Sequence, residues 1–78
     1  MRQRKPALVI TFDTTAEAMA MESFCGKSGI SGRLIPLPGE ISAGCGLAWK
    51  TIPEEEASIE KSMEDHYIRW SSMYTLEL

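Results

Sequence analysis

One short stretch of the chain combines a nucleophile with the residues that build a tight loop. Cys45 lies between Gly44 and Gly46, and Ser42 precedes it by three positions. Flanking glycines leave a cysteine side chain uncovered, and successive flexible peptides can direct amide N–H groups at an anion. Such donors would stabilise a thiolate, the nucleophilic form of cysteine. We therefore expect a reactive thiol at Cys45, with the Ser42 hydroxyl either donating to sulfur or closing the loop on a backbone group.

Two other side chains bear on this hypothesis. Cys25 lies late in a predicted helix, where packing is its expected role, and packing is also the alternative for Cys45. A resolving role for Cys25 would need the two Cα atoms within about 7 Å. The single histidine, His66, lies near the end of another predicted helix, where a cation suits the helix dipole. Since no oriented base accompanies the nucleophile, the sequence argues against a stand-alone thiol enzyme.

Two short strands are predicted to flank the loop. Residues 33–37 and 47–51 are apolar runs rich in residues that favour strands. Pro36 lacks an amide donor, so we expect the first of these strands at a sheet edge. The loop between them is expected to present the thiol through five shaping residues: Pro38, Gly39, Ile41, Gly44 and Gly46.

The first predicted helix starts from a capping box, in which Thr14 caps the helix and Glu17 reaches back to it. It is expected to end at Gly26 or Gly29, because glycine readily adopts the left-handed conformation that closes a helix. Helical spacing predicts an apolar face made of Ala16, Met19, Ala20, Ser23 and Phe24.

The second predicted helix follows another capping-box candidate, Thr51–Glu54, with a proline in its first turn. A buried strand at 7–12 precedes the first helix, and an alternating run at 70–78 follows the second. The apolar face of the second helix is expected to contain Ile59, Met63 and Tyr67.

This order of elements predicts an α+β fold, the ferredoxin-like βαββαβ sandwich, with a four-stranded antiparallel sheet and two helices on one face. We expect a single domain over residues 1–78, with residues 1–6 frayed. Nothing in the chain is predicted to cover the other sheet face. Alternation places Trp70, Tyr74 and Leu76 on one side of the last strand, where they either complete the core or mark a surface for homodimer formation.

The residues Pro38–Ala48 read P-G-E-I-S-A-G-C-G-L-A, with an I-S-x-G-C-G core. They resemble the signature of a family of small domains described as putative selenium/sulfur carrier-like, and the resemblance extends over about residues 7–67. It implies that Cys45, with Ser42 nearby, holds sulfur or selenium as a persulfide or perselenide and relays it between donor and acceptor proteins. The alternative is a non-catalytic ferredoxin-like binding or regulatory module that self-associates through its open sheet face.

Charge and composition narrow the possible functions of the protein and its expected cellular compartment. The net charge of −3 argues against nucleic-acid binding, and the apolar run at 7–10 is too short for a signal peptide or a membrane span. Two cysteines are too few for the disulfide framework of a secreted miniprotein, so we expect a reduced, cytoplasmic protein. The spacing of Cys25, Cys45 and His66 does not match a zinc site, and we expect neither a metal nor a cofactor.

Overall fold

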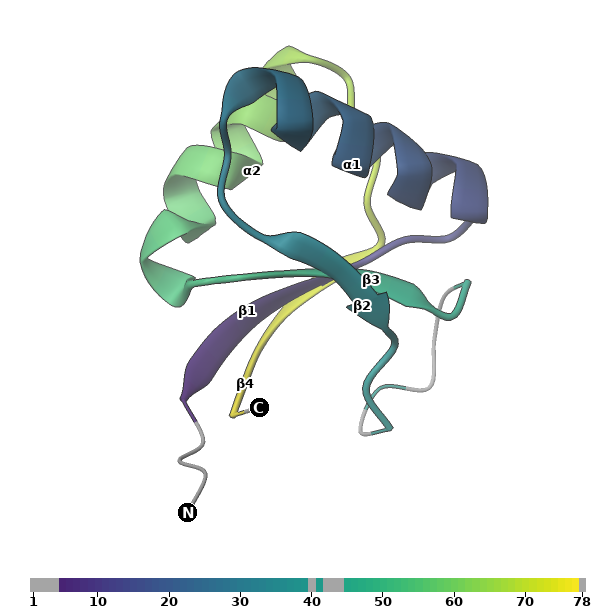
Figure 1. The fold of residues 1–78 in the computed structure, drawn as a ribbon, viewed down its shortest axis with the longest axis vertical. Coiled ribbons are helices and arrows are strands. Elements are labelled where there is room, and N and C mark those ends of the chain that lie inside the picture. The colour runs from purple at the N-terminus through teal and green to yellow at the C-terminus, as the bar shows by residue number, and fades with distance from the viewer. Residues whose placement is uncertain (1–4, 40, 42–44, 78) are drawn as a thin grey trace.

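The computed structural model describes residues 5–39, 41 and 45–77, and its strands and helices follow one another in the order β-α-β-β-α-β (Figure 1). The four strands form one antiparallel sheet in the order β2-β3-β1-β4, and both helices lie on the same face of it (Figure 1). This is the predicted α+β ferredoxin-like architecture, with β2 at an edge as expected. The elements are β1 (Pro6–Thr11), α1 (Thr15–Ser28), β2 (Arg33–Pro36), β3 (Leu47–Thr51), α2 (Glu56–Asp65) and β4 (Ser72–Glu77).

Strand β1 forms the centre of the sheet, because it pairs with β3 on one side and with β4 on the other. Pro6 already pairs with Glu77, so the strand begins inside the stretch that was predicted to be frayed. Because side chains of a strand alternate between faces, Leu8 and Ile10 point to the helices and Val9 to the opposite face. The main core also contains Phe12, Ala18, Met21, Cys25, Trp49, Ile59 and Met63.

Helix α1 begins after the predicted cap Thr14 and ends at Gly29, the later of the two predicted end points, but it buries a different face. Thr14 caps the helix, its hydroxyl accepting a hydrogen bond from the Glu17 amide at 3.1 Å, and Gly29 closes it in the left-handed conformation with φ of 71°. Apolar residues occur on several sides of this helix, so spacing alone could not select the face that packs on the sheet. The buried residues are Ala18, Met21 and Cys25, whereas Met19 is half exposed.

The second capping-box prediction is wrong. Thr51 is the last residue of β3, paired with Leu8, and its hydroxyl is buried without a hydrogen-bond partner among the described residues. A short 3₁₀ helix at Pro53–Glu55 follows the extended residue Ile52 and leads into α2. Its pairing with Leu8 therefore keeps Thr51 in β3, and the helix starts without a side-chain cap.

The apolar face of α2 contains Ile59 and Met63 as predicted, but Tyr67 is 91% exposed. The helix ends at Asp65, and Tyr67 adopts a left-handed conformation with φ of 58°. Its amide donates to the Glu64 carbonyl at 3.3 Å, and the Ile68 amide donates to the Met63 carbonyl at 2.8 Å. This pair of bonds is a Schellman motif, which turns Tyr67 outward and brings Ile68 against the core in its place.

The second face of the sheet is partly covered, contrary to the sequence-based expectation. Val9 and Ala48 on this face are fully buried, and Ile41 from the β2–β3 loop packs over them with only 7% of its surface exposed. Leu76 packs beside this small cluster, whereas Trp70 precedes β4 and packs against the main core on the helix side. Trp70 and Leu76 therefore do not share one side of the last strand.

Candidate functional site

Cys45 lies at the end of the loop that joins the antiparallel strands β2 and β3. The strand ladder continues one step beyond Pro36 and Leu47, because the Leu37 amide donates to the Gly46 carbonyl at 2.9 Å. Gly46 has a φ of 90°, a conformation that a residue with a Cβ atom rarely adopts. Gly46 is thus required by the backbone conformation directly before β3.

The start of the loop is shaped by a turn. The Ile41 amide donates to the Pro38 carbonyl at 3.0 Å, and this turn directs the Ile41 side chain onto the second face of the sheet. Gly39 within the turn is exposed, and a Cβ atom at this position would contact nothing within 4 Å. Three of the five predicted shaping residues, Pro38, Ile41 and Gly46, therefore have identifiable structural roles.

The main chain fixes Cys45 to the centre of the sheet. Its amide donates a hydrogen bond of 3.0 Å to the carbonyl of Phe12, the residue that follows β1. The side chain is half-buried and packs against the main core, and its sulfur lies 4.0 Å from the carbonyl oxygen of Leu47. Cys45 is a free cysteine. The structure thus holds a half-buried cysteine in a defined place, beside the residue that follows the end of β1.

Ser42 and Gly44 lie outside the residues that the structure describes. The predicted hydroxyl contact to sulfur, and the amide donors expected from the glycine-flanked peptides, therefore stay predictions.

Cys25 has the packing role that the sequence indicated. It is a free cysteine with 1% of its surface exposed, and its sulfur lies 3.8 Å from the Met21 sulfur. Burial raises the pKa of the Cys25 thiol to about 11, because the interior disfavours the thiolate. Cys25 is therefore protonated at neutral pH and is a poor nucleophile.

His66 caps the C-terminus of α2. Its Nδ1–H donates to the Ser62 carbonyl at 2.9 Å, and its ring packs against Phe24 with a centroid separation of 4.7 Å. These contacts give the histidine a structural role of the kind that the sequence favoured. Within residues 5–39, 41 and 45–77, no three His, Cys, Asp or Glu side chains are grouped so that they could hold a metal ion.

A cavity of about 530 Å³ opens at the same end of the sheet as Cys45. Its wall includes Asp13, which directly follows Phe12, and Trp70, whose neighbour Ser71 donates from its amide to the Thr11 carbonyl at 2.7 Å. The charged side chains of its lining are Asp13, Glu17, Glu64 and Arg69. A mainly acidic hollow therefore lies close to the strand end that positions the thiol.

Together these features define a small ferredoxin-like α+β domain that holds a free, half-buried thiol beside the end of its central strand. The chain belongs to the family described as "Putative Se/S carrier protein-like", whose model matches residues 7–75. This finding confirms the family resemblance of the I-S-x-G-C-G loop. No curated protein and no solved structure matches the chain.

Sequence reasoning missed a second group of polar residues. Lys5, Arg33 and Lys50 line a pocket at the other end of the sheet. Lys5 was assigned to a frayed terminus, and the pairing of Arg33 with Lys50 becomes visible only with the strand register. Neither helix in the described part of the chain is long and apolar enough to cross a membrane.

Proposed function

We propose that this protein carries sulfur or selenium as a persulfide or perselenide on Cys45. The observation that carries the proposal is the half-buried, unpaired thiol of Cys45, which lies within the segment matched by the carrier-like family and is fixed by its backbone to the carbonyl of Phe12. Partial burial would let a partner reach the sulfur while the loop shields the labile adduct from bulk solvent.

The loading step is a transfer between two cysteines. The Cys45 thiolate attacks the terminal sulfur of a donor protein's persulfide, a new S–S bond forms on Cys45, and the donor's S–S bond breaks. The donor cysteine leaves as a thiolate, so the step needs no external oxidant or reductant. Unloading is the same exchange with an acceptor protein, and a perselenide follows the same balance with selenium as the terminal atom.

The two cysteines differ in the way that a carrier with a single loading site requires. Cys25 is buried and its pKa is raised to about 11, so it stays a thiol under the conditions in which transfer would occur. Cys45 is half-buried at the end of the sheet. The adduct should therefore form at Cys45 and not at Cys25.

Ser42 is proposed to donate a hydrogen bond to the adduct, on the basis of its position three residues before Cys45. Donor and acceptor proteins are the proposed partners, and a reducing compartment such as the cytoplasm is the proposed setting, because a persulfide is readily lost or cross-linked by oxidation. The mainly acidic cavity lined by Asp13, Glu17 and Glu64 would offer a docking partner a charged surface near the thiol.

The test is intact-mass spectrometry after incubation with a cysteine desulfurase and cysteine, or with a selenocysteine lyase and selenocysteine, without reducing agent. We expect a gain of one sulfur or selenium atom that dithiothreitol removes. The gain should be absent from a Cys45→Ala variant, retained by a Cys25→Ala variant and shorter-lived in a Ser42→Ala variant. No adduct with either donor, or an adduct that persists in Cys45→Ala, would contradict the proposal.

A further inference from the structure

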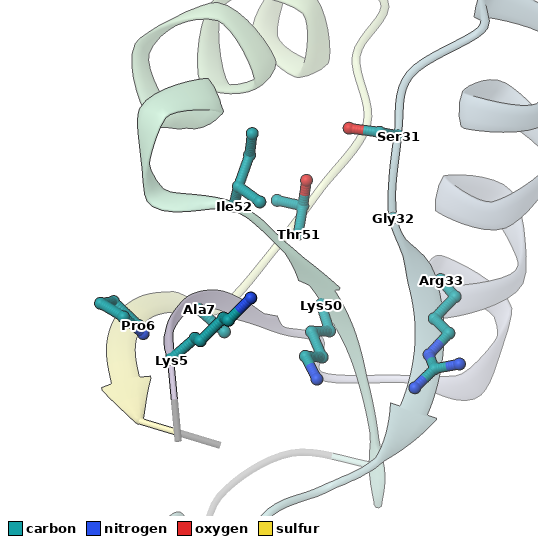
Figure 2. A pocket seen from close by; sticks show the side chains of 9 residues that line it. All are labelled: Lys5, Pro6, Ala7, Ser31, Gly32, Arg33, Lys50, Thr51 and Ile52. Carbon is teal, nitrogen blue, oxygen red and sulfur yellow. The ribbon is translucent and has the colours of Figure 1, made fainter. Parts of the chain in front are cut away.

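A positively charged pocket lies at the end of the sheet opposite Cys45 (Figure 2). It has a volume of about 510 Å³ and is formed by the start of β1, the segment that leads into β2 and the end of β3. Cys45 precedes β3 whereas the pocket adjoins its last residues, so the length of that strand, roughly 15 Å, separates the two sites. The pocket is therefore distinct from the thiol site.

Three cations line this pocket, and no acidic side chain of the described residues does. They are Lys5 before β1, Lys50 on β3 and Arg33 on β2, and Figure 2 shows them in this order across the view, as the strand order β1-β3-β2 requires. The protein as a whole carries a net charge of −3. The pocket is therefore positively charged although the protein as a whole is negatively charged.

Two of the cations lie directly opposite each other on neighbouring strands. Arg33 and Lys50 are register partners in the antiparallel β2–β3 pair, which brings their Cβ atoms to within about 5.5 Å. Like charges directly opposite each other destabilise a sheet, unless a negative charge lies between or beside them. Figure 2 shows both side chains extending to the same side of the strands. A bound anion would turn this repulsion into a favourable interaction.

Two residues with hydroxyl groups, Ser31 and Thr51, are also among those that line the pocket. Thr51 is only 6% exposed, and its Oγ1 is buried and without a hydrogen-bond partner among the described residues. A buried polar atom of this kind costs free energy until a partner satisfies it. In Figure 2 the hydroxyls of Thr51 and Ser31 lie at the end of the pocket away from the Arg33 guanidinium. Thr51 pairs with Leu8 on the helix side of the sheet, whereas Lys50 and Arg33 point to the opposite side, so an anion held by these cations does not reach the Thr51 hydroxyl.

We propose that this pocket binds a small organic anion, with its oxyanion group held by Arg33, Lys50 and Lys5. Guanidinium and ammonium groups both recognise phosphate and carboxylate oxygens through charge-assisted hydrogen bonds. Apolar surface from Pro6, Ala7 and the half-exposed Ile52 completes the wall and would contact the ligand's carbon skeleton.

The test is a titration of the ¹⁵N-labelled full-length chain, followed by NMR. The probes are ribose 5-phosphate, gluconate, inorganic phosphate and uncharged ribose. We expect saturable shifts at the amides of Gly32, Arg33, Lys50 and Thr51 with ribose 5-phosphate or gluconate, weaker binding of inorganic phosphate and none of ribose. Whichever polyhydroxy anion binds more tightly identifies the oxyanion as phosphate or carboxylate. Binding should weaken as the salt concentration rises.

Matched variants locate the site. Arg33→Gln should weaken binding about tenfold or more, whereas Arg69→Gln at the opposite end of the molecule should leave it unchanged. Lys5→Gln and Lys61→Gln form a second pair, in which the first weakens binding and the second does not.

Three results would overturn the proposal. The first is the absence of saturable shifts with every anion up to about 10 mM, a concentration at which even weak sites bind. The second is an equal loss of affinity in Arg33→Gln and Arg69→Gln. The third is binding of an acidic peptide such as oligoglutamate without binding of any small anion, which would assign the surface to a protein partner.

Discussion

The backbone amide of Cys45 donates a hydrogen bond of 3.0 Å to the carbonyl oxygen of Phe12. Phe12 is fully buried in the main core, directly after the central strand β1, so the thiol-bearing residue is joined to the buried centre of the fold. The main-chain hydrogen bond thus fixes the position of Cys45, and the residue keeps part of its surface exposed. A carrier needs this combination, because a partner enzyme must find the sulfur in one place.

The two cysteines should differ sharply in alkylation. At neutral pH we expect iodoacetamide to modify Cys45 in the native protein and to leave Cys25 unmodified, because Cys25 is 1% exposed and has a pKa raised to about 11. Peptide mass mapping over time measures both rates. A Cys45→Ala variant should take up label only after denaturation. Equal, slow labelling of both residues would support the binding-module alternative.

Cys25 should also make stability depend on alkaline pH. Its pKa is raised from the ordinary value of 9.0 to about 11 in the folded state, so its contribution to stability is fully present below pH 9 and is lost as pH rises toward 11. Two pKa units correspond to about 2–3 kcal/mol of unfolding free energy. Urea unfolding of the wild type and of Cys25→Ala across this range isolates the effect, because every other ionisable group is the same in the two proteins. Parallel pH profiles would contradict the assignment.

Three glycines should respond to alanine in a set order. Gly39→Ala should change the unfolding free energy little, because the new Cβ meets nothing within 4 Å and the glycine has no positive φ. Gly46→Ala should cost about 1–2 kcal/mol, since its φ of 90° is strained for any other residue although space is open. Gly32→Ala should cost most, because its Cβ would lie 2.5 Å from Trp49 Nε1 and 2.6 Å from the Lys50 carbonyl oxygen. Urea denaturation gives the three changes in unfolding free energy. A different order would show that the backbone before β2 or β3 shifts to accommodate the new side chain.

The Ile41 side chain should be needed to cover the second sheet face. Ile41→Ala should cost about 2–4 kcal/mol, because it removes the residue that packs on Val9 and Ala48. The uncovered face should then self-associate, which size-exclusion chromatography across a range of concentrations would detect. Met19→Ala removes a side chain of similar size from an exposed helix position and serves as the control. A variant that stays as stable as the wild type would contradict the packing role of Ile41.

Local signals in the sequence predicted most of the fold correctly. The alternation and apolar runs located all four strands, and Thr14 and Gly29 fixed the ends of α1 because both act on the backbone within a few residues. Failures occurred where tertiary contacts decide between local options. Thr51 looked like a helix cap, but its pairing with Leu8 kept it in β3.

The same distinction applies to the sites. Cys45 was singled out from its neighbours in the chain, and its role as a reactive thiol stays a prediction. The basic pocket was missed because Lys5, Arg33 and Lys50 are far apart in the sequence and meet only through the strand order β2-β3-β1. The role of Ile41 was missed for a related reason, since no periodic pattern marks a loop side chain that folds back over a sheet.

Tyr67 occupies the position of a Schellman motif that glycine normally fills. A left-handed conformation costs a residue with a Cβ atom about 1–2 kcal/mol, and the side chain is too exposed to regain this by packing. Tyr67→Gly should therefore stabilise the protein by about 0.5–1 kcal/mol, after the greater chain entropy of glycine in the unfolded state is subtracted. Tyr67→Ala is the control, because it removes the ring and keeps the backbone strain, so its stability should stay close to that of the wild type. Thermal unfolding of the three proteins measures the difference. A loss of stability in Tyr67→Gly that Tyr67→Ala shares would show instead that the phenol ring contributes to packing against the end of α2.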